Sequence, residues 1–335
     1  METREKVFIK LLHNEVFVYF SDALKNMLSK VPDSILKKIE EIRLRADKPI
    51  IITGSFGELL LGINGIANDV NNSYCVLSSE ILRIFEAMCE NSVYAVQEEL
   101  RNGFITIKGG HRIGIAGRVI HEGKCIRNIK YFSGINIRLS RQVPGAADGV
   151  MNYIIKGNSV FHTIVISPPQ CGKTTLIRDI ARQISSGIQN NGFNGMKVGI
   201  VDERSEIAAC YKGVPQNDVG IRTDILDCCP KSIGMITLLR SMSPQVIVTD
   251  ELGNKEDRDA VMQVINAGVK LITSAHGSNI DEVSERPEIS EIFKNKVFER
   301  IIILSNFDGP GTIERVVDGK TMNVLFGREE VCCLK

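Results

Sequence analysis

The segment Ser167-Pro168-Pro169-Gln170-Cys171-Gly172-Lys173-Thr174-Thr175 is the most informative part of this 335-residue chain for its fold class. It follows a short apolar run at 163–166 and leads into a helical pattern at 174–185. A Gly-Lys-Thr segment between a strand and a helix is typical of a phosphate-binding loop, because backbone N–H groups and the helix N-terminus together surround an anion. We therefore expect the whole stretch to bind the phosphates of ATP.

The residues at the end of this loop have distinct expected roles. Gly172 lets the backbone approach the phosphates without a Cβ in the way. Lys173 would reach the β- and γ-phosphates, and Thr174 would ligate Mg²⁺. The loop departs from the usual pattern at Ser167, where glycine is common, and its two prolines stiffen it. The alternative is a chance Gly-Lys-Thr-Thr at a helix start, which the further motifs disfavour.

A second motif, Val246-Ile-Val-Thr-Asp-Glu251, places two carboxylates at the end of an apolar strand. Open α/β sheets bind ligands at the carboxyl ends of their strands. We expect Asp250 to hold the Mg²⁺ shell through water and Glu251 to polarise the water that attacks the γ-phosphate. The metal-site residues predicted from sequence are therefore Thr174 and Asp250. The alternative is a solvated strand end with no part in the chemistry.

Two further strand ends carry candidate residues. Asp202, Glu203 and Glu206 follow another apolar run, and one of them could orient water or Mg²⁺, with Glu203 the candidate catalytic residue. The alternative is that Asp202 caps a helix whose first turn favours acidic residues. The end of the expected strand at 270–274 offers three residues that could sense the γ-phosphate, namely Thr273, Ser274 or His276, although a single histidine is usually structural.

The distribution of apolar residues divides the chain into two domains, at 1–145 and 146–335. The first, which includes an expected helix at Val93–Leu100, mixes helices with short strands and is predicted to be a smaller α+β domain that makes oligomer or partner contacts. Pro144-Gly-Ala-Ala-Asp148 has the composition of a hinge. In the second, strands and helices alternate, which predicts a RecA-like P-loop NTPase core of α/β class with a mostly parallel sheet and a C-terminal hairpin around Asp318-Gly319.

The composition is that of an ordinary globular protein, with 43% hydrophobic and 24% charged residues and a formal net charge of +1. This near-neutral charge and the absence of Trp disfavour a nucleic-acid groove, so no direct nucleic-acid partner is expected. The start lacks the apolar core of a secretory signal, and no apolar run is long enough for a spanning helix. The sequence therefore predicts a cytoplasmic protein.

The second half resembles the ATPases of type II and type IV secretion and pilus retraction. Three segments look like their acidic box, Walker B motif and histidine box, namely Val201-Asp-Glu-Arg-Ser-Glu206, Ser243-Pro-Gln-Val-Ile-Val-Thr-Asp-Glu251 and Thr273-Ser-Ala-His276. Over both halves the chain is similar to the stage III sporulation protein AA family of endospore-forming bacteria. The segments that carry this similarity, besides the loop at 167–175, are Glu41-Ile-Arg-Leu-Arg45, Tyr94-Ala-Val-Gln-Glu-Glu-Leu-Arg101, Gly109-Gly-His-Arg-Ile-Gly114 and Ile135-Asn-Ile-Arg-Leu-Ser140.

This resemblance implies a homo-oligomeric ring, expected to be a hexamer, with ATP and Mg²⁺ as cofactors. It implies an ATPase on the mother-cell side, peripheral to a membrane-embedded, secretion-like complex between mother cell and forespore. In the family's loop the position of Gln170 is more often glycine.

The similarity to secretion ATPases also points to the strand before the hinge as a source of arginines that act on a neighbouring subunit. Arg138 and Arg141 are therefore candidate catalytic residues, with Arg112 next. Such an arginine neutralises the charge that builds up on the transferring phosphoryl group. The alternative is that these arginines pair with surface acids, which contributes little.

Two other functions remain open at this point. A RecA-like nucleic-acid-dependent ATPase, such as a helicase, would need a basic groove with exposed aromatic residues. A nucleotide-gated scaffold with negligible turnover would have no need of both Asp250 and Glu251.

Overall fold

The structure is a computed structural model that describes residues 4–90, 96–101, 103–123 and 125–328. The chain divides into two compact units, Met1–Arg141 and Gln142–Lys335, whereas the sequence placed the division after residue 145. Within the described ranges, no helix combines the length and the apolar character that crossing a membrane would require.

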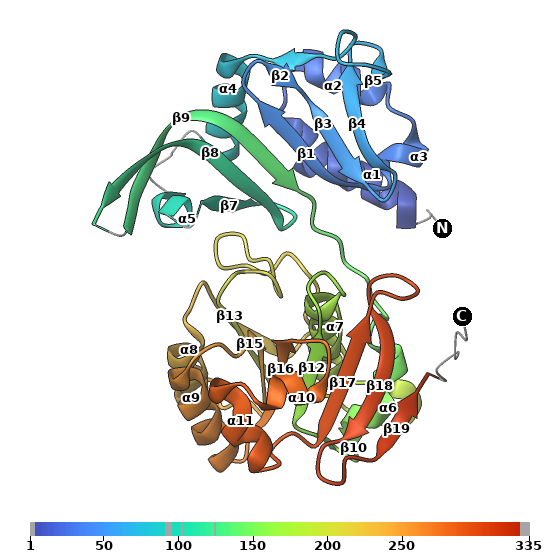
Figure 1. The fold of residues 1–335 in the computed structure, drawn as a ribbon, viewed down its shortest axis with the longest axis vertical. Coiled ribbons are helices and arrows are strands. Elements are labelled where there is room, and N and C mark those ends of the chain that lie inside the picture. Colours follow the sequence, from blue (N-terminus) through green and yellow to red (C-terminus); the bar gives the residue numbers. More distant parts are fainter. Residues whose placement is uncertain (1–3, 91–95, 102, 124, 329–335) are drawn as a thin grey trace. The chain divides into compact units, whose positions relative to one another are not determined.

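The first unit is built on a seven-stranded antiparallel sheet with the order β5-β4-β3-β1-β9-β8-β7 (Figure 1). Its strands are β1 (Ile39–Arg45), β3 (Ile51–Gly54), β4 (Gly57–Gly62), β5 (Gly65–Ala67), β7 (Phe104–Ile107), β8 (His111–Glu122) and β9 (Cys125–Arg138), and β2 (Lys48–Pro49) pairs separately with β6 (Cys75–Val76). Its helices are α1 (Arg4–Glu15), α2 (Asp22–Ser29), α3 (Asp33–Leu36), α4 (Ser78–Met88) and α5 (Gln97–Arg101). The first three residues of the predicted helix Val93–Leu100 lie outside the described residues, and α5 covers most of the rest.

Alternation along β1 gives this sheet one apolar and one polar face. Ile42 and Leu44 are buried in the core of the first unit, whereas Glu41, Arg43 and Arg45 point to the opposite side of the pleat. Helices α1, α2 and α4 contribute buried residues to the same core, so they cover the apolar face (Figure 1). The arginines of β1 therefore lie on the face away from these helices.

The second unit contains an eight-stranded sheet with the order β14-β13-β15-β16-β12-β17-β18-β19. The pairs from β14 to β17 are parallel, whereas β18 pairs antiparallel with both β17 and β19. Its strands are β12 (Thr163–Ser167), β13 (Val198–Asp202), β14 (Thr223–Asp227), β15 (Val246–Glu251), β16 (Lys270–His276), β17 (Arg300–Ser305), β18 (Thr312–Asp318) and β19 (Val324–Gly327), and β10 (Ile155–Lys156) pairs separately with β11 (Ser159–Val160). Its helices are α6 (Asp148–Ile154), α7 (Lys173–Ser186), α8 (Lys231–Ser241), α9 (Lys255–Asn266), α10 (Ile280–Ser284) and α11 (Pro287–Lys294).

Helices pack on both faces of this sheet. Helices α6 and α7 share one core with Val165 of β12, while α8, α9, α10 and α11 share another with Ile164 and Ile166 of the same strand. A parallel strand covered on both faces needs a continuous apolar sequence, which is what the run at 163–166 supplies. The predicted α/β class with a mostly parallel sheet is thus confirmed.

The sequence reading missed parts of both sheets. Strand β14 at one edge was not predicted, because acidic residues flank its short apolar centre and leave no apolar run. In the first unit, β8 and β9 form a hairpin much longer than the short strands that the sequence predicts for this domain. Cross-strand pairing extends these strands through segments whose own sequence is polar.

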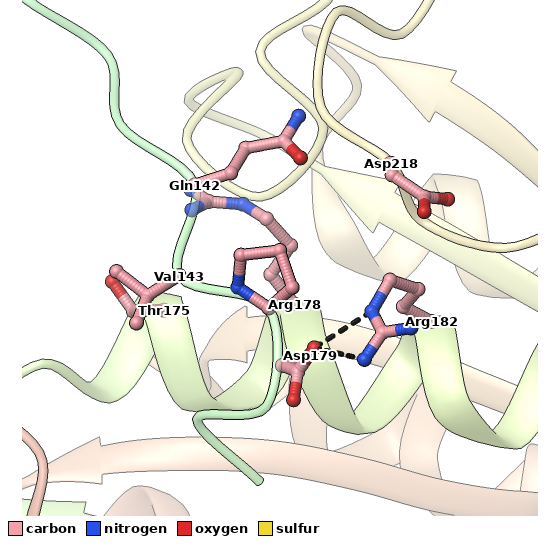
Figure 2. Close-up of a pocket in the computed structure, with 8 residues that line it drawn as sticks. Gln142, Val143, Thr175, Arg178, Asp179, Arg182 and Asp218 are labelled. Atoms are coloured by element: carbon pink, nitrogen blue, oxygen red, sulfur yellow. Dashed lines mark hydrogen bonds and ion pairs between the residues drawn. The ribbon is translucent and has the colours of Figure 1, made fainter. Parts of the chain in front are cut away.

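One buried carboxylate fixes the start of the second unit. Asp179 on α7 accepts hydrogen bonds from the backbone N–H groups of Gly145 (3.1 Å) and Ala147 (2.9 Å), and it forms an ion pair with Arg182 at 2.7 Å. Figure 2 shows the Arg182 guanidinium directed at the Asp179 carboxylate. Burial raises the pKa of Asp179, but the Arg182 guanidinium and the Ala147 N–H outweigh it and hold the pKa below its ordinary value.

We expect Asp179→Asn to lower the free energy of unfolding by about 3 kcal/mol at neutral pH, because buried donors lose their ionised partner. The pKa of Asp179 is lower in the folded protein than in the unfolded chain. Its contribution is therefore present at neutral pH and is lost as the pH falls below about 4. Urea unfolding at several pH values measures this.

Asp224→Asn is the matched control, since Asp224 is exposed on β14, and its effect should stay within about 0.5 kcal/mol. An Asp179→Asn protein as stable as the parent at neutral pH would contradict the assignment.

Candidate functional site

The predicted phosphate-binding loop lies between β12 and α7, as its sequence required. Gly172 has φ +82° and is the N-cap of α7. A Cβ at this position would lie only 3.0 Å from the backbone nitrogen of Gly311, whose N–H donates to the Cys171 carbonyl. Both the left-handed conformation and the close backbone contact therefore require glycine here.

Gln170 also has a positive φ, of +62°, in the same loop. A side chain in this left-handed region costs roughly 1–2 kcal/mol, and glycine largely avoids that cost. The loop therefore carries local backbone strain at Gln170.

The ammonium group of Lys173 is held close to β12 and β16. Its Nζ donates to the Ser167 carbonyl at 3.2 Å and lies 2.6 Å from Nδ1 of His276. An ammonium group can only donate, so Nδ1 accepts and the proton of the neutral imidazole resides on Nε2. Burial lowers the pKa of Lys173 to about 8, although the Glu251 carboxylate opposes the shift.

The Glu251 carboxylate contacts the other ring nitrogen of the same imidazole. Its Oε2 lies 3.2 Å from Nε2 of His276, and its Oε1 accepts the His276 backbone N–H at 3.2 Å. Arg286 lies 3.9 Å from Oε1. A chain of contacts therefore runs from Lys173 through His276 to Glu251, with the ends of β12, β15 and β16 supplying its members.

A second ionic cluster surrounds Lys231, the first residue of α8. Its Nζ lies 3.0 Å from Oδ1 of Asp250 and pairs with Oε2 of Glu203. Burial by itself lowers the pKa of Lys231, but the two carboxylates outweigh it and raise the pKa above its ordinary value. The carboxylates predicted from the ends of β13 and β15 are thus brought together around one ammonium group.

Asp202 organises the loop after β13. It is fully buried and accepts backbone N–H groups of Glu206, Ile207 and Ala208 at 2.8–2.9 Å. Burial raises its pKa to about 6 in spite of these hydrogen bonds. The alternative that Asp202 caps a helix is wrong, because the residues that follow form a loop and not a helix.

The residues around Asp250 fit a magnesium ion that is held in part by substrate phosphates. Among the described residues no group of three or more His, Cys, Asp or Glu could hold a metal ion by itself. Mg²⁺ in phosphoryl-transfer sites commonly takes one or two carboxylates, with phosphate oxygens and water completing the octahedron. Asp250 Oδ1 is buried and lies 3.0 Å from the Lys231 ammonium group, so a metal ion bound to this oxygen would take the place of that group.

The predicted arginines lie in the first unit, in different surroundings. Arg141 donates to the Ile39 carbonyl at 2.6 Å, and its guanidinium lies 4.1 Å from the centre of the Phe8 ring. Burial lowers its pKa. Arg138 is exposed on β9 and faces Arg112 of β8 in register.

Sequence reasoning missed Lys231 and Arg286. A signal for Lys231 existed, because a lysine directly after Pro230 begins a helix, where the helix dipole disfavours positive charge. A position at a helix start is a weak signal by itself, because Lys255, which begins α9, is exposed. Arg286 offered no comparable signal.

A parallel core sheet with a phosphate-loop topology, preceded by a smaller α+β unit, is the architecture of RecA-like secretion ATPases. Among solved structures, the chain is similar to the ATPase DotB of Legionella pneumophila, with a TM-score of 0.52 and 14% identity over 81% of this chain and 73% of that chain. It is also similar to the pilus retraction motor PilT, solved with bound ADP, with a TM-score of 0.51 and 14% identity over 79% and 74%. At this identity the likeness shows the fold alone.

Sequence comparison defines the family. The profile described as "Sporulation stage III, protein AA" matches residues 12–324. Stage III sporulation protein AA of Bacillus subtilis (strain 168) is 40% identical over 312 residues, which are 93% of this chain and 97% of that protein. The chain therefore belongs to the stage III sporulation protein AA family.

Proposed function

We propose that this protein binds ATP with Mg²⁺ and hydrolyses it as the motor subunit of a secretion-like sporulation complex. The observation that carries the proposal is the chain of contacts from Lys173 through His276 to Glu251, with distances of 2.6 and 3.2 Å, next to the left-handed Gly172. It joins a phosphate-binding cation to a carboxylate that can accept a proton.

In this proposal each residue of the site has one task. Lys173 and the N–H groups of the loop hold the β- and γ-phosphates at the N-terminus of α7. Thr174 and Asp250 hold Mg²⁺, which neutralises charge on the triphosphate and its leaving group. Glu251 orients the attacking water and accepts its proton, because an ionised carboxylate at a strand end can face the γ-phosphate.

His276 would couple the binding of the γ-phosphate by Lys173 to the activation of the attacking water by Glu251. Its imidazole contacts both Lys173 and Glu251, so a phosphate that attracts the Lys173 ammonium changes the partner available to the imidazole. The hydrogen bond from Nε2 to Glu251 then holds the carboxylate in place. We assign His276 as the sensor of the γ-phosphate on this basis.

The assembly is proposed from the family and the fold. Membership of the stage III sporulation protein AA family and the fold shared with the motor PilT support a motor on a membrane complex, peripheral to it on the mother-cell side. We propose a homo-hexameric ring in which an arginine of the first unit acts on the ATP of a neighbour. Arg138 is the better candidate, since Arg141 is engaged with Ile39 and Phe8.

Lys173→Ala should weaken ATP binding by at least about 100-fold, because the fixed positive charge at the phosphates is lost. Lys197→Ala, which removes an exposed lysine at the start of β13, should bind as the parent does. Isothermal titration calorimetry measures both affinities. Unchanged affinity of Lys173→Ala would refute the phosphate-loop assignment.

The lowered pKa of Lys173 gives the same titration a second readout. Bound phosphate favours the charged ammonium, so the parent should take up protons on binding near pH 8. Its affinity should decline as the pH rises further. Comparing buffers of different ionisation enthalpy detects this uptake, which Lys173→Ala should lack.

Glu251→Gln should bind ATP normally and hydrolyse it at least about 100-fold more slowly, because an amide cannot accept the proton of water. Its oxygen can still accept the His276 N–H, so the fold is expected to persist. Steady-state phosphate release measures the rate. If hydrolysis stays within about twofold of the parent, the general base lies elsewhere, with Glu203 the first alternative.

Arg138→Ala should bind ATP but lose roughly 10³-fold in hydrolysis if Arg138 acts on a neighbouring subunit. Mixing it with Glu251→Gln should restore part of the activity, because some contacts then join an intact Arg138 to an intact Glu251. Arg127→Ala, which alters an exposed arginine of β9, is the control. Full activity of Arg138→Ala alone, or no recovery in demonstrated mixed oligomers, would rule out this role.

A further inference from the structure

Lys231 is a buried lysine at a position that is locally unfavourable for it. It begins α8, after the N-cap Pro230, and its side chain is 7% exposed. The positive end of the helix dipole and the loss of hydration both disfavour an ammonium group there. The cost is offset by two carboxylates from separate strand ends, Asp250 at 3.0 Å and Glu203 in direct contact.

The lysine contacts the same oxygen of Asp250 that is suited to a metal ion. Oδ1 is buried, and the Lys231 ammonium group lies 3.0 Å from it. An ammonium group in this position and a divalent cation bound to the same oxygen repel each other at short range. The two cations must therefore compete for Asp250.

We propose that Lys231 is a tethered cation that occupies the magnesium side of Asp250 and must be displaced when Mg²⁺ and nucleotide enter together. This inference deepens the proposed function and rests on it in taking Mg²⁺–nucleotide as the ligand. On displacement the ammonium group keeps Glu203 as its partner. The Glu203 side chain is 39% exposed, so it can move with the lysine, whereas that of Asp250 is 16% exposed and fixed at the strand end.

Two consequences follow for the reaction cycle. The metal alone competes poorly with a covalently attached ammonium group, whereas phosphate oxygens add negative charge that favours the divalent ion. Lys231 thus makes metal loading depend on nucleotide. It also keeps Glu203 paired, which leaves Glu251 as the carboxylate available to the attacking water. Lys231 is in this sense a positioning residue.

The test measures metal binding to the full-length protein without nucleotide. Mn²⁺ is the probe, because electron paramagnetic resonance counts the free ion directly. Lys231→Met removes the charge and keeps an unbranched side chain, and we expect it to bind one Mn²⁺ about tenfold or more tightly than the parent. Adding Asp250→Asn to this variant should abolish the gain.

Lys255→Met is the matched control, because Lys255 is an exposed lysine that also begins a helix, α9. Its Mn²⁺ affinity should equal that of the parent. Without the lysine, the carboxylates of Asp250 and Glu203 repel each other. If Lys231→Met fails to fold for this reason, as judged by circular dichroism, the double variant Lys231→Met with Glu203→Gln removes one of these two negative charges. That variant should still gain affinity at Asp250.

The outcomes separate the inference from the proposed function. Parent-like Mn²⁺ affinity in a folded Lys231 variant, or a gain that survives Asp250→Asn, overturns the inference. A gain that depends on Asp250 supports it even if the parent shows no ATP hydrolysis, in which case the proposed function fails alone. If the parent hydrolyses ATP but the Lys231 variant binds Mn²⁺ no more tightly than the parent, the proposed function stands and the role of Lys231 as a tethered cation is ruled out.

Discussion

The candidate site depends on one physical constraint, which is that ammonium groups withdrawn from water at the carboxyl edge of the parallel sheet must have anionic or polar partners. Half-buried Lys173 meets the constraint through the Ser167 carbonyl and His276, and buried Lys231 meets it through Asp250 and Glu203. An unpaired charge at the position of Lys231 would cost several kcal/mol, so this lysine is tolerated only with its partners in place. The partners are the carboxylates and the imidazole that a nucleotide-hydrolysing site also needs.

The fold provides these partners through strand order. Parallel pairing in the order β13-β15-β16-β12 delivers the ends of four strands to one edge, and each end carries a polar residue of the site. The apolar runs behind these ends are buried between two layers of helices, which fixes the strands to within small displacements. Asp202 and Asp179 hold the adjacent loops in place, because the carboxylate of Asp202 accepts three backbone N–H groups and that of Asp179 accepts two. Stability and site geometry therefore have a common origin.

Local sequence predicted the elements whose chemistry is local. The phosphate loop, the strand ending in Asp250-Glu251 and the strand ending at His276 were all readable, because each motif is contiguous and follows an apolar run. Lys231 was not singled out, since its role arises from contacts with Asp250 at the end of β15 and Glu203 directly after β13. The contacts of Arg141 could not be predicted for the same reason, because Phe8 and Ile39 are remote from it in the sequence. The helix considered after Asp202 was a reasonable local alternative, which tertiary hydrogen bonds to that carboxylate overrode.

A crystal structure with Mg²⁺ and a non-hydrolysable ATP analogue would show whether the two ionic clusters form a single Mg²⁺–nucleotide site. We expect the β- and γ-phosphates to contact the backbone N–H groups of the loop at 167–175 and the Lys173 ammonium group, with Mg²⁺ beside Thr174 and Asp250. We further expect Glu251 to face the γ-phosphate and Lys231 to have moved away from Asp250 while remaining paired with Glu203. Phosphates bound away from this loop, or Mg²⁺ bound without contact to the Asp250 side of the site, would contradict this expectation.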